Sequence, residues 1–147
     1  MKYSILLVFV LISSCTKSIE CDDPVVQSLF INVIDADGNN LIDKGEIMVD
    51  DIIVRYKEQE IVNAVFSDVE SIKNLISINL NGPEGSLIYE IQFSESSSDT
   101  LVLELTELVE DDSCNNSIWA LNSVSYNGVN RPIEDFNGDF LITVTLE

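Results

Sequence analysis

The sequence predicts an all-β domain, and three observations indicate it. Runs rich in Val, Ile, Leu, Phe, Tyr and Thr recur along the chain, and 46% of its 147 residues are hydrophobic. Several runs alternate apolar and polar residues, which is the period of a strand with one face in solvent. Turn-forming pairs such as Asn127-Gly128 and Asn137-Gly138 separate the runs. We therefore predict a single β-sandwich domain.

Eight segments are expected to form the strands, because β-branched and aromatic residues dominate them and turn residues bound them. The first is a nearly continuous apolar run, and the next two are short β-branched runs. The remaining segments show alternation or aromatic enrichment. In chain order the predicted strands cover residues 28–35, 51–57, 61–66, 75–80, 87–93, 100–106, 118–126 and 140–146.

The alternation assigns faces to these strands. Ile76, Ile78 and Leu80 are expected to face the core, while Ser77 and Asn79 face solvent. Segments 101–106 and 142–146 follow the same rule. Short strands at such spacing, with turns between them, are typical of an immunoglobulin-like antiparallel β-sandwich of about seven or eight strands.

The first fifteen residues resemble a bacterial lipoprotein signal. Lys2 gives a positive start, residues 5–12 are an unbroken apolar run, and two serines precede Cys15. Eight residues form a helix of about 12 Å, too short for a bilayer core of about 30 Å. The resemblance implies that residues 1–14 are removed and that lipid on Cys15 anchors the protein in a membrane. The residue after it is Thr16, not Asp, which by analogy with known sorting rules favours the outer membrane.

The resemblance also sets the expected domain organisation. Residues 15–24 would be a lipidated tether, and residues 25–147 would form the β-sandwich. The net charge is −19, with 26 acidic and 7 basic residues. Such a surface repels nucleic acid and anionic headgroups, and it attracts cations and basic partners.

Cysteine usage fits export to an oxidising compartment. If lipidation uses Cys15, the two remaining cysteines are Cys21 and Cys114. We expect them to form a disulfide, which closes a long loop and contributes about 4–5 kcal/mol in the chain-entropy model.

Histidine is absent from the chain. This removes the commonest general base and the commonest transition-metal ligand, so zinc sites and Ser-His-Asp triads are excluded. Carboxylates are so abundant that no catalytic pair can be singled out. We therefore expect a protein that is not an enzyme.

One segment carries the pattern of a metal site. Residues 35–46 resemble the twelve-residue calcium loop of an EF-hand, which needs oxygen ligands at positions 1, 3, 5, 7, 9 and 12 about 2.3–2.6 Å from the ion. Position 6, where the family has glycine, is Asn40, and the flanking segments do not read clearly as helices. The predicted calcium ligands are Asp35, Asp37, Asn39, the Leu41 carbonyl, Asp43 and Glu46.

The same segment also reads as an ordinary turn between β runs. Asp-Gly followed by Asn-Asn is a common turn signal. In this interpretation the strand at 28–35 is followed by a turn at 36–40, and residues 41–42 resume extended structure. A loop of this geometry could still bind calcium weakly, with a dissociation constant of about 10⁻⁴–10⁻³ M.

The whole chain resembles small outer-membrane lipoproteins of Bacteroidetes. The matching parts are residues 30–41, the run Asp99-Thr100-Leu101, Cys114 and Asn127-Gly128. The resemblance implies a lipid-anchored protein on the periplasmic or cell-surface face. Its expected role is a non-enzymatic interaction with a protein or glycan partner. The alternative is a calcium-binding protein that uses the 35–46 loop.

Overall fold

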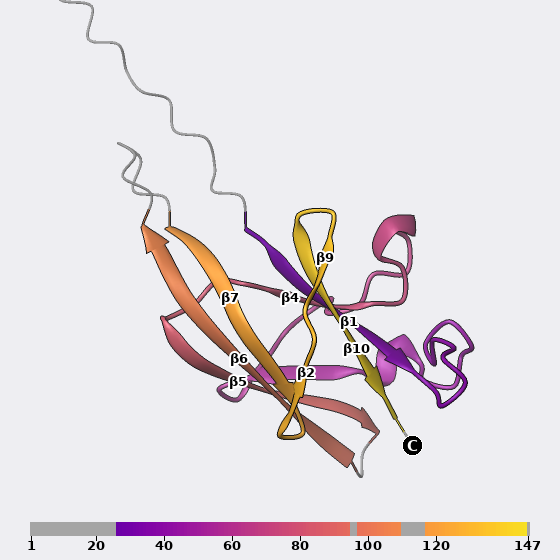
Figure 1. Ribbon diagram of the computed structural model, residues 1–147. Helices are drawn as coiled ribbons and strands as arrows, with labels where there is room; N and C mark the ends of the chain where they lie inside the picture. Colours follow the sequence, from indigo (N-terminus) through magenta and orange to yellow (C-terminus); the bar gives the residue numbers. More distant parts are fainter. Residues whose placement is uncertain (1–25, 95–96, 110–116, 147) are drawn as a thin grey trace, which may run out of the picture.

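The computed structural model describes residues 26–94, 97–109 and 117–146 (Figure 1). The predicted signal and tether, together with Cys15, Cys21 and Cys114, lie outside these residues. In the described part of the chain, no helix is long and apolar enough to cross a membrane.

The fold is all-β, as predicted, with two sheets and two short 3-10 turns, η1 (Val49–Asp51) and η2 (Glu70–Ile72). The smaller sheet has the strand order β4-β1-β10-β9 and the larger one β3-β2-β5-β6-β7-β8. The sheets form two layers (Figure 1). The four-stranded sheet contains β1 (Ser28–Ile34), β4 (Ile76–Asn79), β9 (Glu134–Phe136) and β10 (Asp139–Thr145). The six-stranded sheet contains β2 (Ile53–Tyr56), β3 (Gln59–Glu60), β5 (Gly85–Ser94), β6 (Ser97–Val109), β7 (Ser117–Tyr126) and β8 (Val129–Arg131).

The core lies between the sheets and is built from alternate residues of each strand, as the sequence pattern predicts. Strand β6 shows this most clearly, because its alternate leucines are almost fully buried. The least exposed core side chains, all under 2% exposed, include Leu29, Ile31, Val33, Ile76, Ile78, Leu80, Ile91, Leu101, Leu103, Leu105, Ile142 and Val144.

The predicted purely antiparallel arrangement is wrong at one pair of strands. Strands β1 and β10 run parallel, with Leu29 opposite Phe140 and Val33 opposite Val144. The other pairs of named strands are antiparallel. Whether two strands run parallel or antiparallel depends on which strands become neighbours in the folded sheet. An alternating sequence pattern is the same in either direction, so it cannot predict this.

The described residues form ten strands in place of the predicted seven or eight, because three hairpins each have one short arm. The turns at Asn127-Gly128 and Asn137-Gly138 are confirmed, with all four residues at positive φ. The arms β8 and β9 next to these turns have only three residues each. The hairpin between β2 and β3 turns at Lys57 and Glu58, at φ 48° and 67°. It therefore lacks the usual Asn-Gly signature.

The predicted strand at 61–66 is also wrong. The chain turns there, and Asn63 adopts a left-handed conformation with φ 58°. The following residues run along the edge of β4, where the amide of Ser77 donates to the Ala64 carbonyl at 2.6 Å. This contact explains why Ser77, expected to face solvent, is only 9% exposed.

Candidate functional site

The predicted calcium loop folds as a series of turns after β1. The carboxylate of Asp35 accepts the backbone N–H groups of Asp37 and Asn39, each at 2.9 Å, and the Asn39 amide contacts both of its oxygens. A second series of turns covers residues 41–45, so the extended structure expected at 41–42 does not form. Leu41 and Ile42 instead insert into the core, at 7% and 6% exposure.

A lysine of the loop holds its two ends together. The ammonium Nζ of Lys44 lies 2.8 Å from Asp35 Oδ2 and 2.6 Å from Glu46 Oε1. The Lys44 contact and the Asn39 hydrogen bonds keep the pKa of Asp35 well below its ordinary value. The same carboxylates raise the pKa of Lys44. The two acids at the ends of the predicted ligand set thus share an internal cation.

The predicted ligands Leu41 and Asp43 also have intramolecular partners. The Leu41 carbonyl accepts the amides of Glu46 and Ile47, at 2.9 and 3.2 Å. Asp43 Oδ1 accepts a hydrogen bond from the side chain of Asn74 at 2.9 Å. The Leu41 carbonyl and the Asp43 carboxylate therefore have a structural role within the loop.

The residue at loop position 6 explains part of this conformation. Asn40 donates to the Asn32 side chain at 2.8 Å and to the Asn74 carbonyl at 3.0 Å, and it accepts the Asp43 amide at 2.8 Å. The left-handed residues of the loop are Gly38 and Gly45 instead. The chain path therefore differs from that of an EF-hand, which turns sharply at position 6.

In this conformation Lys44 contacts the acids at both ends of the predicted ligand set. Among the described residues, no group of three or more acidic or cysteine side chains is placed to hold a metal. Calcium binding by this loop stays a prediction, and it would require Lys44 to leave both carboxylates.

A different region forms a polar and aromatic groove with a volume of about 490 Å³. It lies between β2, β3 and β5 of the larger sheet and β4 of the smaller one, and the segment 61–66 crosses beside it. Strands from both layers therefore fix its walls, and this rigidity favours a defined binding site.

Two tyrosines on neighbouring strands line this groove, Tyr56 partly exposed and Tyr89 buried at 4% exposure. Tyr56 and Tyr89 face each other on neighbouring strands, with ring centroids 5.0 Å apart and an interplanar angle of 32°. The Lys57 ammonium lies 5.0 Å from the Tyr56 ring centroid, a distance at which the cation is attracted to the ring. Burial raises the pKa of Tyr89 to about 12, so its hydroxyl is protonated at neutral pH.

The rim of the groove is lined by exposed carboxamides. Gln59, Asn63, Asn79 and Asn81 all reach it. Asn79 accepts a hydrogen bond from Ser28. In the described chain, the side-chain amides of Gln59, Asn63 and Asn81 have no intramolecular hydrogen bond. Their donors and acceptors are therefore available to a ligand.

Sequence reasoning missed this groove. Its tyrosines lie 33 positions apart, and only the β2–β5 register places Tyr56 opposite Tyr89. The rim residues lie in turns and strand ends, where amides are ordinary turn formers. One signal was present in the sequence: polar residues gather on both sides of the apolar run at 75–80.

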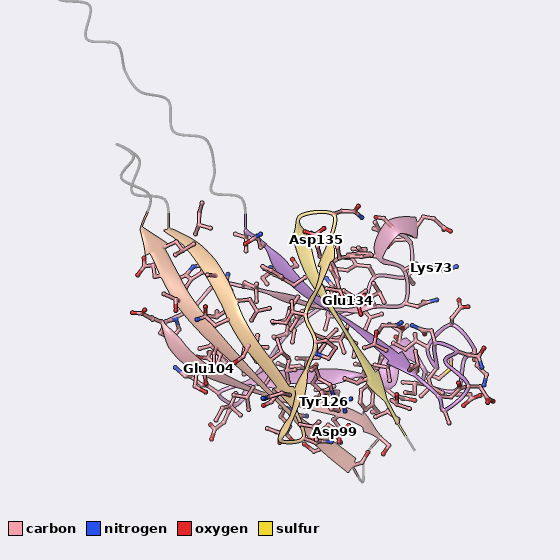
Figure 2. The ribbon with its side chains drawn as sticks, in the orientation of Figure 1. Lys73, Asp99, Glu104, Tyr126, Glu134 and Asp135 are labelled. Carbon is pink, nitrogen blue, oxygen red and sulfur yellow. The ribbon has the colours of Figure 1, made fainter. Side chains whose placement is uncertain are left out.

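Acidic and aromatic side chains also meet at the opposite edge of the larger sheet. The Tyr126 hydroxyl donates to Asp99 Oδ2 at 2.6 Å, and the Asn127 amide donates to Asp99 Oδ1 at 2.8 Å (Figure 2). Asn127 Oδ1 in turn accepts the amide of Thr100 at 2.8 Å. These contacts tie the start of β6 to the β7–β8 turn, which is a structural role.

Comparison with known proteins returned no match at the level of a family model, a curated protein or a solved structure.

Proposed function

We propose that the protein is a lipid-anchored lipoprotein of the outer membrane whose β-sandwich is a non-enzymatic binding module. The observation that carries the proposal is the position of Cys15 at the end of a lipoprotein-like signal, 13 residues before Ser28, where β1 begins. A chain of 13 residues spans at most about 45 Å. This reach allows the sandwich to stand clear of the headgroups.

The fold supports a binding role. A domain of two packed sheets, with a groove whose walls come from both layers, presents a rigid recognition surface. The groove is lined mainly by neutral amides and aromatic rings, and such groups recognise ligands without supplying an acid–base pair. The finer architecture that we propose is immunoglobulin-like, and the pairing of the first and last strands in one sheet supports it.

Metabolic labelling with an alkyne fatty acid tests the anchor. Cells that express the full chain should show labelled protein in the outer-membrane fraction. Cys15→Ser should abolish the label and release the protein from the membrane, whereas the matched control Cys21→Ser should keep both. Label retained on Cys15→Ser, or none on the wild type, would overturn the proposed anchor.

A further inference from the structure

We propose that the groove between Tyr56, Tyr89 and the segment 61–66 binds a neutral carbohydrate. The inference rests on the proposed binding role and is independent of the lipid anchor. It assigns a ligand class to a site that is defined by side chains from both sheets.

The groove pairs a partly exposed tyrosine ring with a rim of amides. A sugar ring has C–H faces that pack on aromatic carbon and hydroxyls that both donate and accept hydrogen bonds at its edge. Tyr56 is partly exposed and supplies aromatic surface to the groove, and the buried Tyr89 packs against its ring. Gln59, Asn63 and Asn81 supply amides that each carry two donors and one acceptor.

The amides at the rim of the groove have unused hydrogen-bonding capacity. These three amides have no hydrogen-bond partner within the described residues, whereas the loop carboxamides of Asn32, Asn39, Asn40 and Asn74 all have one. Exposed amides of this kind are hydrated in the free protein. A ligand with several hydroxyls can replace that water at small cost, because each lost hydrogen bond is regained.

The charge of the groove and of the whole chain favours a neutral ligand. The residues that line the groove include no lysine or arginine, and their only charged side chain is Glu60. Lys57, which contacts the Tyr56 ring, is not among the lining residues. The surrounding chain carries a net charge of −19. Phosphorylated, sulfated or uronic-acid ligands would therefore be repelled, and a ligand of nucleic-acid type would meet the same barrier. A neutral sugar satisfies the amides without meeting this repulsion.

The volume of the groove and its fixed walls suit a small ligand. A volume of about 490 Å³ lies within the range of about 300–1,000 Å³ that is usual for small-ligand sites. Tyr56 and Tyr89 are fixed by their paired strands and by each other. The left-handed backbone of Asn63, at φ 58°, holds that amide at the rim. A preorganised site of this kind loses little conformational entropy on binding.

The test uses the folded chain without its lipid and a panel of neutral oligosaccharides: glucans, galactans, mannans and chito-oligosaccharides. Binding is followed by calorimetry, and amide chemical shifts in NMR spectra locate it. We expect at least one member to bind at millimolar concentration or below. The shifts should be confined to residues of β2, β3, β5 around Tyr89, the segment 61–66 and the end of β4.

Variants that remove only rim amides make the test specific. Gln59→Ala combined with Asn81→Ala should weaken binding about tenfold, since each removes a hydrogen bond. Both side chains are exposed, so the fold should persist. The matched control is Asn130→Ala, which removes an exposed amide from β8 at the far edge of the same sheet.

The outcomes separate this inference from the proposed anchor. If no oligosaccharide binds, or if the double variant and the control bind equally, the carbohydrate site is wrong. The anchor is read separately, by fatty-acid labelling of Cys15→Ser. A protein that is acylated but binds no sugar overturns only the inference drawn from the groove.

Discussion

Lys44 and Asp35 form an ion pair with 2.8 Å between Nζ and Oδ2, inside the loop whose sequence resembles a calcium site. The same ammonium reaches Glu46 at 2.6 Å. The loop therefore contains its own positive charge between the first and last acids of the motif. Its conformation needs no external cation.

Replacement of Lys44 should make the loop responsive to calcium. In Lys44→Gln, the carboxylates of Asp35 and Glu46 lose their internal partner and repel each other. We expect millimolar calcium to raise the melting temperature of this variant, because a ligand that binds only the folded state stabilises it. The wild type should show little change. Lys73→Gln, at an exposed lysine next to η2 (Figure 2), is the control. Equal stabilisation of the wild type by calcium would contradict the closed loop.

The Asp35 carboxyl should titrate at unusually low pH. Hydrogen bonds from Lys44 and Asn39 stabilise its charged form, so its pKa lies below the ordinary value of 3.8. A lowered folded-state pKa contributes stability above about pH 3.8, and this contribution is lost as the pH falls further. Carbon-detected NMR of the side-chain carboxyl measures the titration directly. In Lys44→Gln the midpoint should move toward 3.8, and an unchanged midpoint would exclude Lys44 as the main cause.

Removal of the Tyr126 hydroxyl should destabilise the β6–β7–β8 region. The side chain is only 2% exposed, and its hydroxyl donates to Asp99. Tyr126→Phe should lower the free energy of unfolding by about 1–3 kcal/mol, because Asp99 loses a hydrogen bond to its charged group. Chemical denaturation measures this loss. Tyr56→Phe is the control, since among the described residues the Tyr56 hydroxyl has no hydrogen-bond partner, and the change should be small.

Stability should also fall at alkaline pH. Burial raises the pKa of Tyr89 to about 12, and burial together with the Asp99 hydrogen bond raises that of Tyr126 further. Above about pH 10 the unfolded chain loses phenolic protons before the folded chain does, so unfolding is favoured. We expect the melting temperature to decrease progressively between about pH 10 and 12. Tyr126→Phe should flatten this dependence, and an equal slope in both proteins would argue against the phenols as its source.

The sequence predicted what depends on local pattern. Alternation identified the buried residues of β4, β6 and β10, and the Asn-Gly pairs marked two hairpin turns. The sequence did not predict the features that depend on contacts between distant segments of the chain. The apolar run at 61–66 became a turn with an edge contact because Asn63 is left-handed, and Ser77 became buried under that contact.

The candidate sites show the same division. The spacing of acids in residues 35–46 matched a calcium motif, but spacing does not show that Lys44, within the motif, contacts two of its ligands. The groove depends on Tyr56 meeting Tyr89 across two strands and on amides from separate turns reaching one rim. No local sequence pattern predicts these contacts, because they depend on strand register and on the packing of the two sheets.

The parallel pairing of β1 with β10 has a consequence for the order of events during synthesis. Ser28 and Asp139, which are hydrogen-bonded across this pair, lie 111 residues apart in the chain. The smaller sheet therefore cannot close until nearly the whole domain has left the ribosome, and such non-local contacts slow folding. A chain that stays open until its last strand emerges remains a suitable substrate for transport across a membrane. For a chain that is exported as we propose, the strand pair that completes the sandwich would also delay its completion until after export.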